Sequence, residues 1–265
     1  MPRARSAQAG PAAESERLQK YLAQRGLGSR RAIEEWIKAK RLTVNGRIAE
    51  LGIKVTPRDD IRLDGRPVRT RAAAGAQAFL FNRSPGDPLR EAEGERAALI
   101  ERLPKAAGRR FIAVSPMPGI DGGLEIVTSD GALATRLQRA VHKHPSEFTV
   151  RVKGQLGPDQ VAGVKSGKLD RPSRMVIDAI RSSEADLEGS NRWYTVVARD
   201  ASGKDIRQLF ERQGALVSRV LRISIGSLRL DKSLSRGQYR QLEDDEVAAL
   251  TAAPPATPAP ESADS

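Results

Sequence analysis

The sequence contains no cysteine and only two histidines, His142 and His144, among its 265 residues. Without cysteine there can be no disulfide bond and no catalysis by a thiolate. Two histidines are too few for a metal site built on imidazole ligands. Any chemistry must therefore come from carboxylates, hydroxyls, lysines or arginines, and no metal is expected.

Long apolar runs are also missing. No stretch approaches the ~20 apolar residues that a membrane-spanning helix needs. No basic segment followed by an apolar one stands at the start of the chain, as it would in a secretory signal. We therefore expect a cytoplasmic protein that makes no membrane contact.

What the sequence does have is positive charge, with a formal net charge of +12 and a pI near 10.4. Such a balance calls for a polyanionic partner, and nucleic acid is the usual one for a basic protein. An acidic membrane surface is the alternative. The length allows one large domain or two modest ones, and we expect two.

Composition divides the chain into five segments. Residues 1–14 lack apolar periodicity and are expected to form a disordered arm, residues 15–68 a small domain, and residues 69–77 a linker. Residues 78–250 are expected to form a larger second domain. Residues 251–265, rich in Ala, Pro, Thr and Ser, are expected to be a disordered tail.

Residues 15–68 carry the pattern of two short helices followed by short strands. Leu18 and Leu22 share one face of the first helix, which should stop at Gly26. Ser29 is a candidate N-cap of the second helix. This segment holds thirteen basic and seven acidic residues, and its net charge of +6 is half of the excess of the whole chain.

Two features of this segment indicate anion binding and a hairpin. Arg30 and Arg31 begin the second helix, where cations oppose the helix dipole by about 0.3–1 kcal/mol each, so binding of an anion explains them better than stability does. Two merely solvated arginines are the alternative. Asn45 and Gly46 both accept the positive φ of a type I′ turn and predict a hairpin after Leu42–Val44.

The segment resembles the RNA-binding domain named after small-subunit ribosomal protein S-four. The resemblance rests on Arg17–Ala23, Gly28–Arg31, Val44–Gly46, Asp60-Ile61 and Asp64-Gly65. In that family the second helix and the following hairpin contact RNA. The resemblance therefore implies RNA contacts by Arg17, Lys20, Arg30, Arg31, Lys40, Arg41, Asn45 and Arg47. For Asn45 itself, a role limited to the turn is the preferred interpretation.

Residues 78–250 are predicted to be mostly strands with a few helices packed on them, which indicates an α+β domain with one bent, mainly antiparallel sheet. Strands are predicted at 78–81, 111–114, 124–128, 148–152, 174–178, 193–198 and 220–225. Helices are predicted at 131–141 and 206–213, with at best a short one before Pro104. Ser129 or Asp130 can cap the first of these helices.

The second domain is similar to the rRNA pseudouridine synthases that carry the same N-terminal domain. The similarity rests on Phe81–Gly86, Leu124–Asp130, Phe148–Gly154, Lys204–Phe210 and Arg222–Leu230, in that order. The resemblance covers roughly residues 15–250. It implies action on rRNA without a cofactor, and we expect the protein to be a monomer. In that reaction a carboxylate meets the sugar of a flipped-out uridine while the uracil is detached, turned and rejoined through carbon.

The sequence differs from this family in the segment that carries the catalytic residues. The family's Gly-Arg-Leu-Asp segment aligns with Ser115–Pro118, so Pro116 stands at the arginine position and Pro118 at the aspartate position. A proline can neither accept a proton nor act as a nucleophile, and it removes a backbone donor. These substitutions predict a catalytically impaired member of the family.

Other positions of the site change as well. Phe148 replaces a tyrosine and can still stack on a base, and Lys204 and Arg207 remain as pocket cations. The arginine-rich segment of the family becomes Ser202–Asp205, which places an acid, Asp205, on a surface expected to face RNA.

Two alternatives stay open. Asp121, three positions after Pro118, can replace the missing carboxylate if the loop shifts in register, although Asp-Gly-Gly is also an ordinary turn sequence. The chain would then be an active pseudouridine synthase. A third hypothesis is a binder of stalled-ribosome or heat-shock RNA that uses only residues 15–68, with the second domain as scaffold.

Overall fold

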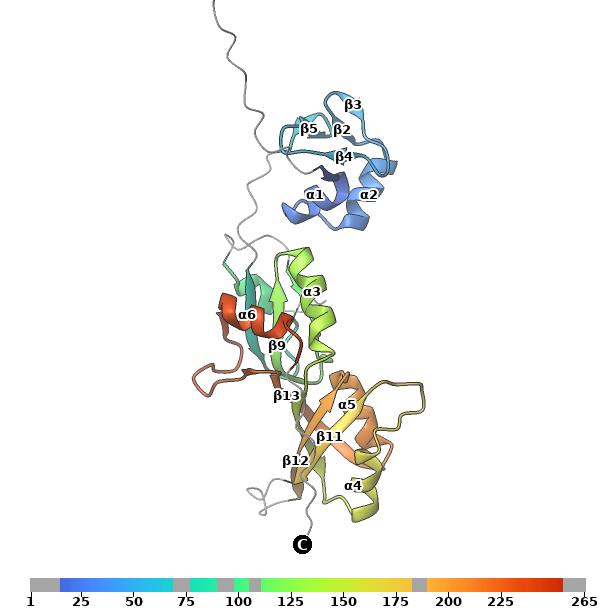
Figure 1. Ribbon diagram of the computed structural model, residues 1–265, viewed down its shortest axis with the longest axis vertical. Coiled ribbons are helices and arrows are strands. Elements are labelled where there is room, and N and C mark those ends of the chain that lie inside the picture. Colours follow the sequence, from blue (N-terminus) through green and yellow to red (C-terminus); the bar gives the residue numbers. More distant parts are fainter. Residues whose placement is uncertain (1–14, 69–76, 90–97, 105–110, 183–189, 255–265) are drawn as a thin grey trace, which may run out of the picture. The chain divides into compact units, whose positions relative to one another are not determined.

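The computed structural model describes residues 15–68, 77–89, 98–104, 111–182 and 190–254 (Figure 1). The chain divides into two compact units, the first containing 15–68 and the second containing the described residues from 77 onward. The expected arm, and most of the expected linker and tail, lie outside the described residues.

The first unit packs two helices against short strands (Figure 1, blue). Its strands form one sheet in the order β3-β2-β5-β6 and a separate pair, β1-β4. The elements are β1 (Glu16–Arg17), α1 (Leu18–Gln24), α2 (Arg30–Lys38), β2 (Leu42–Val44), β3 (Arg47–Ile48), β4 (Lys54–Val55), β5 (Ile61–Leu63) and β6 (Arg66–Pro67).

Local signals of the sequence explain this unit. The Ser29 hydroxyl accepts a hydrogen bond from the Ala32 N–H at 2.9 Å and caps α2, as predicted. Asn45 and Gly46 have φ of +51° and +78°, which confirms the hairpin between β2 and β3. The apolar faces of both helices meet the strands in one buried cluster, built from Leu18, Tyr21, Leu22, Ile33, Ile37, Leu42, Val44, Ala49, Val55 and Ile61.

The second unit is built on a nine-stranded sheet with the main order β11-β12-β10-β13-β9-β7-β15, so the predicted α+β class is confirmed. Strands β14 and β8 pair with β13 and β9. The elements are β7 (Ala78–Arg83), η1 (Leu99–Arg102), β8 (Ile112–Ala113), β9 (Gly122–Thr128), α3 (Gly131–Val141), β10 (Ser146–Lys153), α4 (Pro158–Lys165), β11 (Val176–Ser182), β12 (Asn191–Arg199), α5 (Gly203–Glu211), β13 (Leu216–Ile225), β14 (Leu228–Arg229), β15 (Tyr239–Gln241) and α6 (Asp244–Thr251).

The sheet has two halves that join between β9 and β13. Every strand pair of this sheet is antiparallel except this one, where Gly122 and Gly123 run parallel to Leu221 and Arg222. Gly123 has a φ of +92°, and a Cβ there would lie 2.2 Å from the Arg222 carbonyl oxygen. The expectation of an ordinary Asp-Gly-Gly turn is therefore wrong, because these glycines allow two backbones to approach closely at the start of β9.

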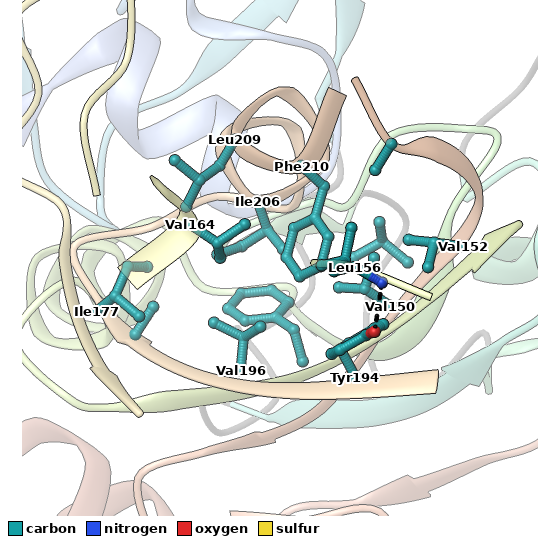
Figure 2. Packing of buried hydrophobic residues seen from close by; sticks show 14 of the residues in the cluster. Val150, Val152, Leu156, Val164, Ile177, Tyr194, Val196, Ile206, Leu209 and Phe210 are labelled. Atoms are coloured by element: carbon teal, nitrogen blue, oxygen red, sulfur yellow. Dashed lines mark hydrogen bonds between the residues drawn. The ribbon is translucent and has the colours of Figure 1, made fainter. Parts of the chain in front are cut away.

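Each half of the sheet carries its own core. Helices α4 and α5 pack on the half formed by β10 to β13, where Val150, Tyr194 and Phe210 belong to one buried cluster (Figure 2). The buried Tyr194 hydroxyl is satisfied by the Leu156 N–H, which donates to it at 2.8 Å (Figure 2). Helices α3 and α6 lie together on the half that contains β7 and β9 (Figure 1).

The structure differs from the predictions at several helices. Helices α4 and α6 were not predicted, although Pro158 at the first turn of α4 and the acidic start of α6 are helix signals. Helix α5 begins at Gly203, three residues early, because Ser202 caps it. Asp130 caps α3, and the short helix before Pro104 is a 3₁₀ turn.

None of the helices in the described segments has the length and apolar character needed to cross a membrane. Within those same segments, no group of three or more histidines and carboxylates is placed to hold a metal ion.

Candidate functional site

The first unit presents exposed cations at both ends of α2 and on the β2–β3 hairpin. Arg30 and Arg31 begin the helix, Lys40 follows it and Arg47 starts β3. Among residues 15–68 and the rest of the described chain, no carboxylate forms a salt bridge with any of these four, nor with Arg17. These side chains are therefore available to an anion.

The other predicted contacts of this unit are already engaged. Arg41 forms a bidentate pair with Asp64, at 2.9 Å and 2.6 Å, and Lys20 lies 3.4 Å from Glu16. The Asn45 amide donates to the Asp59 carboxylate at 2.6 Å and accepts from the Asp60 N–H at 2.9 Å. These bonds support the structural interpretation of Asn45, since its polar atoms hold the turn.

Lys40 has a backbone conformation that its side chain disfavours. It lies just after the C-cap of α2 with a φ of +57°, a position that glycine usually occupies. A left-handed conformation costs a non-glycine residue about 1 kcal/mol or more. Lys40 therefore destabilises the fold at this position, which favours a role for its charge in binding an anion.

In the second unit, residues 115–121 form a loop at the junction of the two half-sheets. Its side chains and carbonyls meet β7, β13 and the first turn of α5. This loop contains Pro116 and Pro118, and the resemblance assigns Phe148 and Ser202–Asp205 to the same site. The structure brings these segments together around the loop.

Three buried charged residues, Arg83, Glu125 and Arg222, bind the loop 115–121. Glu125 accepts from Arg83 at 3.0 Å and from the Met117 N–H at 2.8 Å, and Arg222 lies 3.4 Å from its other oxygen. Arg83, Glu125 and Arg222 are at most 2% exposed. Burial raises the pKa of Glu125 and lowers the pKa of Arg222, while the attraction between them opposes both shifts.

The two arginines also bind the backbone of the loop. Arg83 donates to the carbonyl oxygens of Met117 and Pro118 at 2.9 Å and 2.7 Å. Arg222 donates to the carbonyl oxygen of Ser115 at 2.6 Å. With its carbonyls fixed in this way, the proline-containing loop has one well-defined conformation around Met117.

Asp121 is fully buried and paired with Arg207. The guanidinium donates to both carboxylate oxygens, at 3.0 Å and 2.5 Å, and the Val220 N–H donates to Oδ1 at 2.8 Å. The hydrogen bond to Asp121 raises the pKa of Arg207, so this arginine stays charged. The pair joins the start of β9 to α5 and β13, and the carboxylate accepts three hydrogen bonds.

The space between the loop and α5 is filled. Met117 is buried in the same cluster as Phe148. A Cβ added to Gly203 would lie 2.5 Å from the Met117 thioether and 3.1 Å from Pro118 Cδ, so the loop lies directly against the first turn of α5. Gly203 is the residue that permits this contact.

The structure changes the expectations for the remaining residues of the site. Phe148 is completely buried, so its ring has no exposed face for a base. Asp205 is not the surface acid that we expected: it is 7% exposed, bonds Ser202 to cap α5, and pairs with Arg171. Lys204 is exposed at the first turn of α5.

The sequence analysis missed Arg83, Glu125 and Arg222. One signal was available, because Glu125 interrupts the apolar run Leu124–Val127 in a strand whose seven residues are all buried. A carboxylate at such a position needs a buried cation as its partner.

Comparisons with known proteins agree with this architecture. A family model described as the S4 domain matches residues 16–61. Ribosomal large subunit pseudouridine synthase B of Pseudomonas aeruginosa is 33% identical over 239 residues, which make up 89% of this chain and 62% of that protein. The protein of the same name from Escherichia coli strain K12 is 36% identical over 234 residues, 86% of this chain and 80% of its own length.

A solved structure shows the same fold. The crystal structure of a pseudouridylate synthase has a TM-score of 0.55 with 20% sequence identity, over 88% of this chain and 99% of that one. This likeness concerns the fold, whereas the two sequence relatives and the S4 match show that the chain belongs to the family of ribosomal large subunit pseudouridine synthases and carries an S4 domain in its N-terminal unit.

Proposed function

We propose that this protein binds structured RNA, with ribosomal RNA as the target, and that it is catalytically impaired. The RNA assignment is supported by the names of its relatives and by the exposed cations of the first unit. The proposed impairment is supported by the loop 115–121, where the sequence predicts Pro118 at the family's aspartate position and where Met117 is buried against Gly203.

The chemistry of the family makes this loop decisive. A carboxylate has to reach the sugar of a flipped-out uridine, as nucleophile or as base. Pro118 has no carboxylate, and the loop lies against Gly203 where a base would need room. The nearest carboxylate along the chain, Asp121, has no exposed surface and uses both oxygens to accept hydrogen bonds.

An active pseudouridine synthase that uses Asp121 is the second candidate, and the Asp121–Arg207 pair favours it. The resemblance implies an arginine beside the catalytic aspartate, and Arg207 donates to both oxygens of Asp121. For this role the fully buried carboxylate of Asp121 must gain access to the substrate. The two candidates therefore differ in a measurable product.

Isomerised uridine distinguishes them. If the protein is catalytically impaired, mapping of pseudouridine in total RNA will show the same sites with and without the gene. The second candidate would be established instead by a pseudouridine site that disappears when the gene is deleted and returns with the wild-type gene. That site should also return with the control variant Asp159→Asn, whose acid is exposed on α4, but not with a folded Asp121→Asn variant.

RNA binding by the first unit makes a separate prediction at Lys40. Lys40→Gly removes the unfavourable φ and the charge together, so we expect a fold more stable by about 0.5–1 kcal/mol that binds ribosomal RNA severalfold more weakly. Lys40→Ala is the matched control, since it loses the charge but keeps the strained backbone. Chemical denaturation and fluorescence anisotropy measure the two effects, and unchanged affinity in both variants would contradict a contact by Lys40.

A further inference from the structure

One face of the half-sheet β12-β10-β13 is not covered by α4 and α5, and we infer that this face is a second RNA-binding surface, for single-stranded RNA. Trp193 provides a stacking platform for a base, while Arg151, Arg219 and Lys153 contact phosphates. The inference rests on the proposed function, but the surface lies outside the loop 115–121.

Strand register places the central residues in one row. Arg151 of β10 pairs with Trp193 of β12 on one side and with Arg219 of β13 on the other. The neighbouring row, Val150 with Tyr194 and Val220, is buried in the core beneath α5. Because successive side chains of a strand point to opposite faces, Trp193, Arg151 and Arg219 stand side by side on the open face.

The row is unfavourable for stability. Like charges directly opposite each other in a sheet destabilise it, and here two arginines face each other across β10 and β13. Within the segments that the structure describes, neither arginine forms a salt bridge. An external polyanion would remove this repulsion, so the arrangement indicates a partner rather than a structural role.

The aromatic member of the row identifies the kind of partner. The Arg151 guanidinium lies 6.0 Å from the centre of the Trp193 ring, a cation–π arrangement. The ring is only half-buried on an open sheet. An aromatic ring bordered by cations binds single-stranded nucleic acid, because bases stack on the ring while the cations follow the backbone. A double helix would use the cations and leave the ring unused, because its bases are already stacked.

The surface continues into a cleft at one end of the sheet. In the next row, Lys153 pairs with Asn191 and with Leu216, which is 67% exposed. These residues line a cleft of about 620 Å³ together with Glu211, Gly214, Ala215, Val217 and Ser218. This shallow cleft therefore lies at the edge of the half-sheet, where β13 follows α5, and the inference does not depend on it.

Among the described residues, the acidic groups near this face are already paired with arginines. Glu147 of β10 is paired with Arg229 at 2.9 Å. Asp178 of β11 is paired with Arg199 at 2.6 Å. Glu211 is the acidic residue of the cleft, and it lies 3.4 Å from Arg207.

Fluorescence of Trp193 tests the inference directly, since the chain has only two tryptophans and Trp36 belongs to the first unit. In a full-length Trp36→Phe variant, Trp193 is the sole tryptophan. We expect its emission to be quenched by a single-stranded oligouridine about 12 nucleotides long. The quenching and the anisotropy of the labelled oligonucleotide should give the same binding curve. Binding without quenching would overturn the inference.

Charge removal provides the second readout. Arg151→Gln with Arg219→Gln should weaken oligouridine binding about tenfold and flatten the slope of log K against log salt by about 1.4, or 0.7 per lost contact. Lys143→Gln with Lys165→Gln is the matched control, because both lysines are exposed elsewhere on the second unit. Equal affinities of the two double variants would also overturn the inference.

Two further measurements distinguish failure of the second surface from misfolding of the variants and from failure of the proposed function. The arginine variant relieves a repulsion, so its melting temperature should not fall. If neither oligouridine nor a ribosomal RNA fragment changes in anisotropy, the proposed function itself fails and the second surface with it. If the fragment binds but Trp193 is not quenched, only the second surface is refuted.

Discussion

Glu125→Gln will destabilise the second unit by about 3–5 kcal/mol, the usual cost of removing one member of a buried ion pair. The substitution keeps the shape of the side chain but removes its charge. Arg83 and Arg222 then remain buried with only neutral acceptors, and the Met117 N–H loses a carboxylate partner. The loop 115–121 would lose part of its support at the same time.

The measurement is chemical denaturation in the Trp36→Phe background, where Trp193 reports on the second unit alone. Glu147→Gln is the matched control, because Glu147 also pairs with an arginine, Arg229, but near the surface. An exposed pair contributes about 0–1 kcal/mol, so the control should change little. Equal losses from the two variants would show that the buried cluster is not what holds this junction.

Gly123→Ala is the second change with a large expected effect, a loss of about 3 kcal/mol or more. A side chain at a φ of +92° is strained, and its Cβ would lie 2.2 Å from the Arg222 carbonyl oxygen and 2.7 Å from the Arg222 nitrogen. Both atoms belong to backbone, which cannot rotate away. The parallel pairing of β9 with β13 must therefore open.

Gly119→Ala provides the control four residues earlier, since a Cβ there meets no atom within 4 Å and its φ is ordinary. We expect it to stay within about 0.5 kcal/mol of the parent protein. Denaturation followed by Trp193 fluorescence and circular dichroism measures both variants. A Gly123→Ala protein as stable as Gly119→Ala would mean that the two half-sheets can separate at this point without cost.

Much of the first unit could be predicted because its signals are local. Ser29 lies three residues from the N–H that it caps, and the Asn45–Gly46 turn needs only the conformational preferences of two neighbouring residues. The predicted strands of the second unit were found for the same reason, since alternation along one strand is visible in the sequence.

The candidate site could be predicted only in part. From the sequence we predicted Pro118 at the family's aspartate position and named Asp121 and Arg207 as candidate residues. It could not show that these two residues, 86 positions apart, form a bidentate pair, or that Phe148 is buried. Asp205 was taken for a surface acid, because burial of a side chain depends on residues that are distant in sequence.

By itself, then, the sequence determined the local elements, the α+β class and the family, since each depends on residue identity or short-range spacing. The tertiary structure alone decided the rest. The cluster of Arg83, Glu125 and Arg222 and the row of Trp193, Arg151 and Arg219 exist only because strands from distant parts of the chain pair in one particular register. A shift of one residue in that register would turn each of these side chains to the opposite face of the sheet.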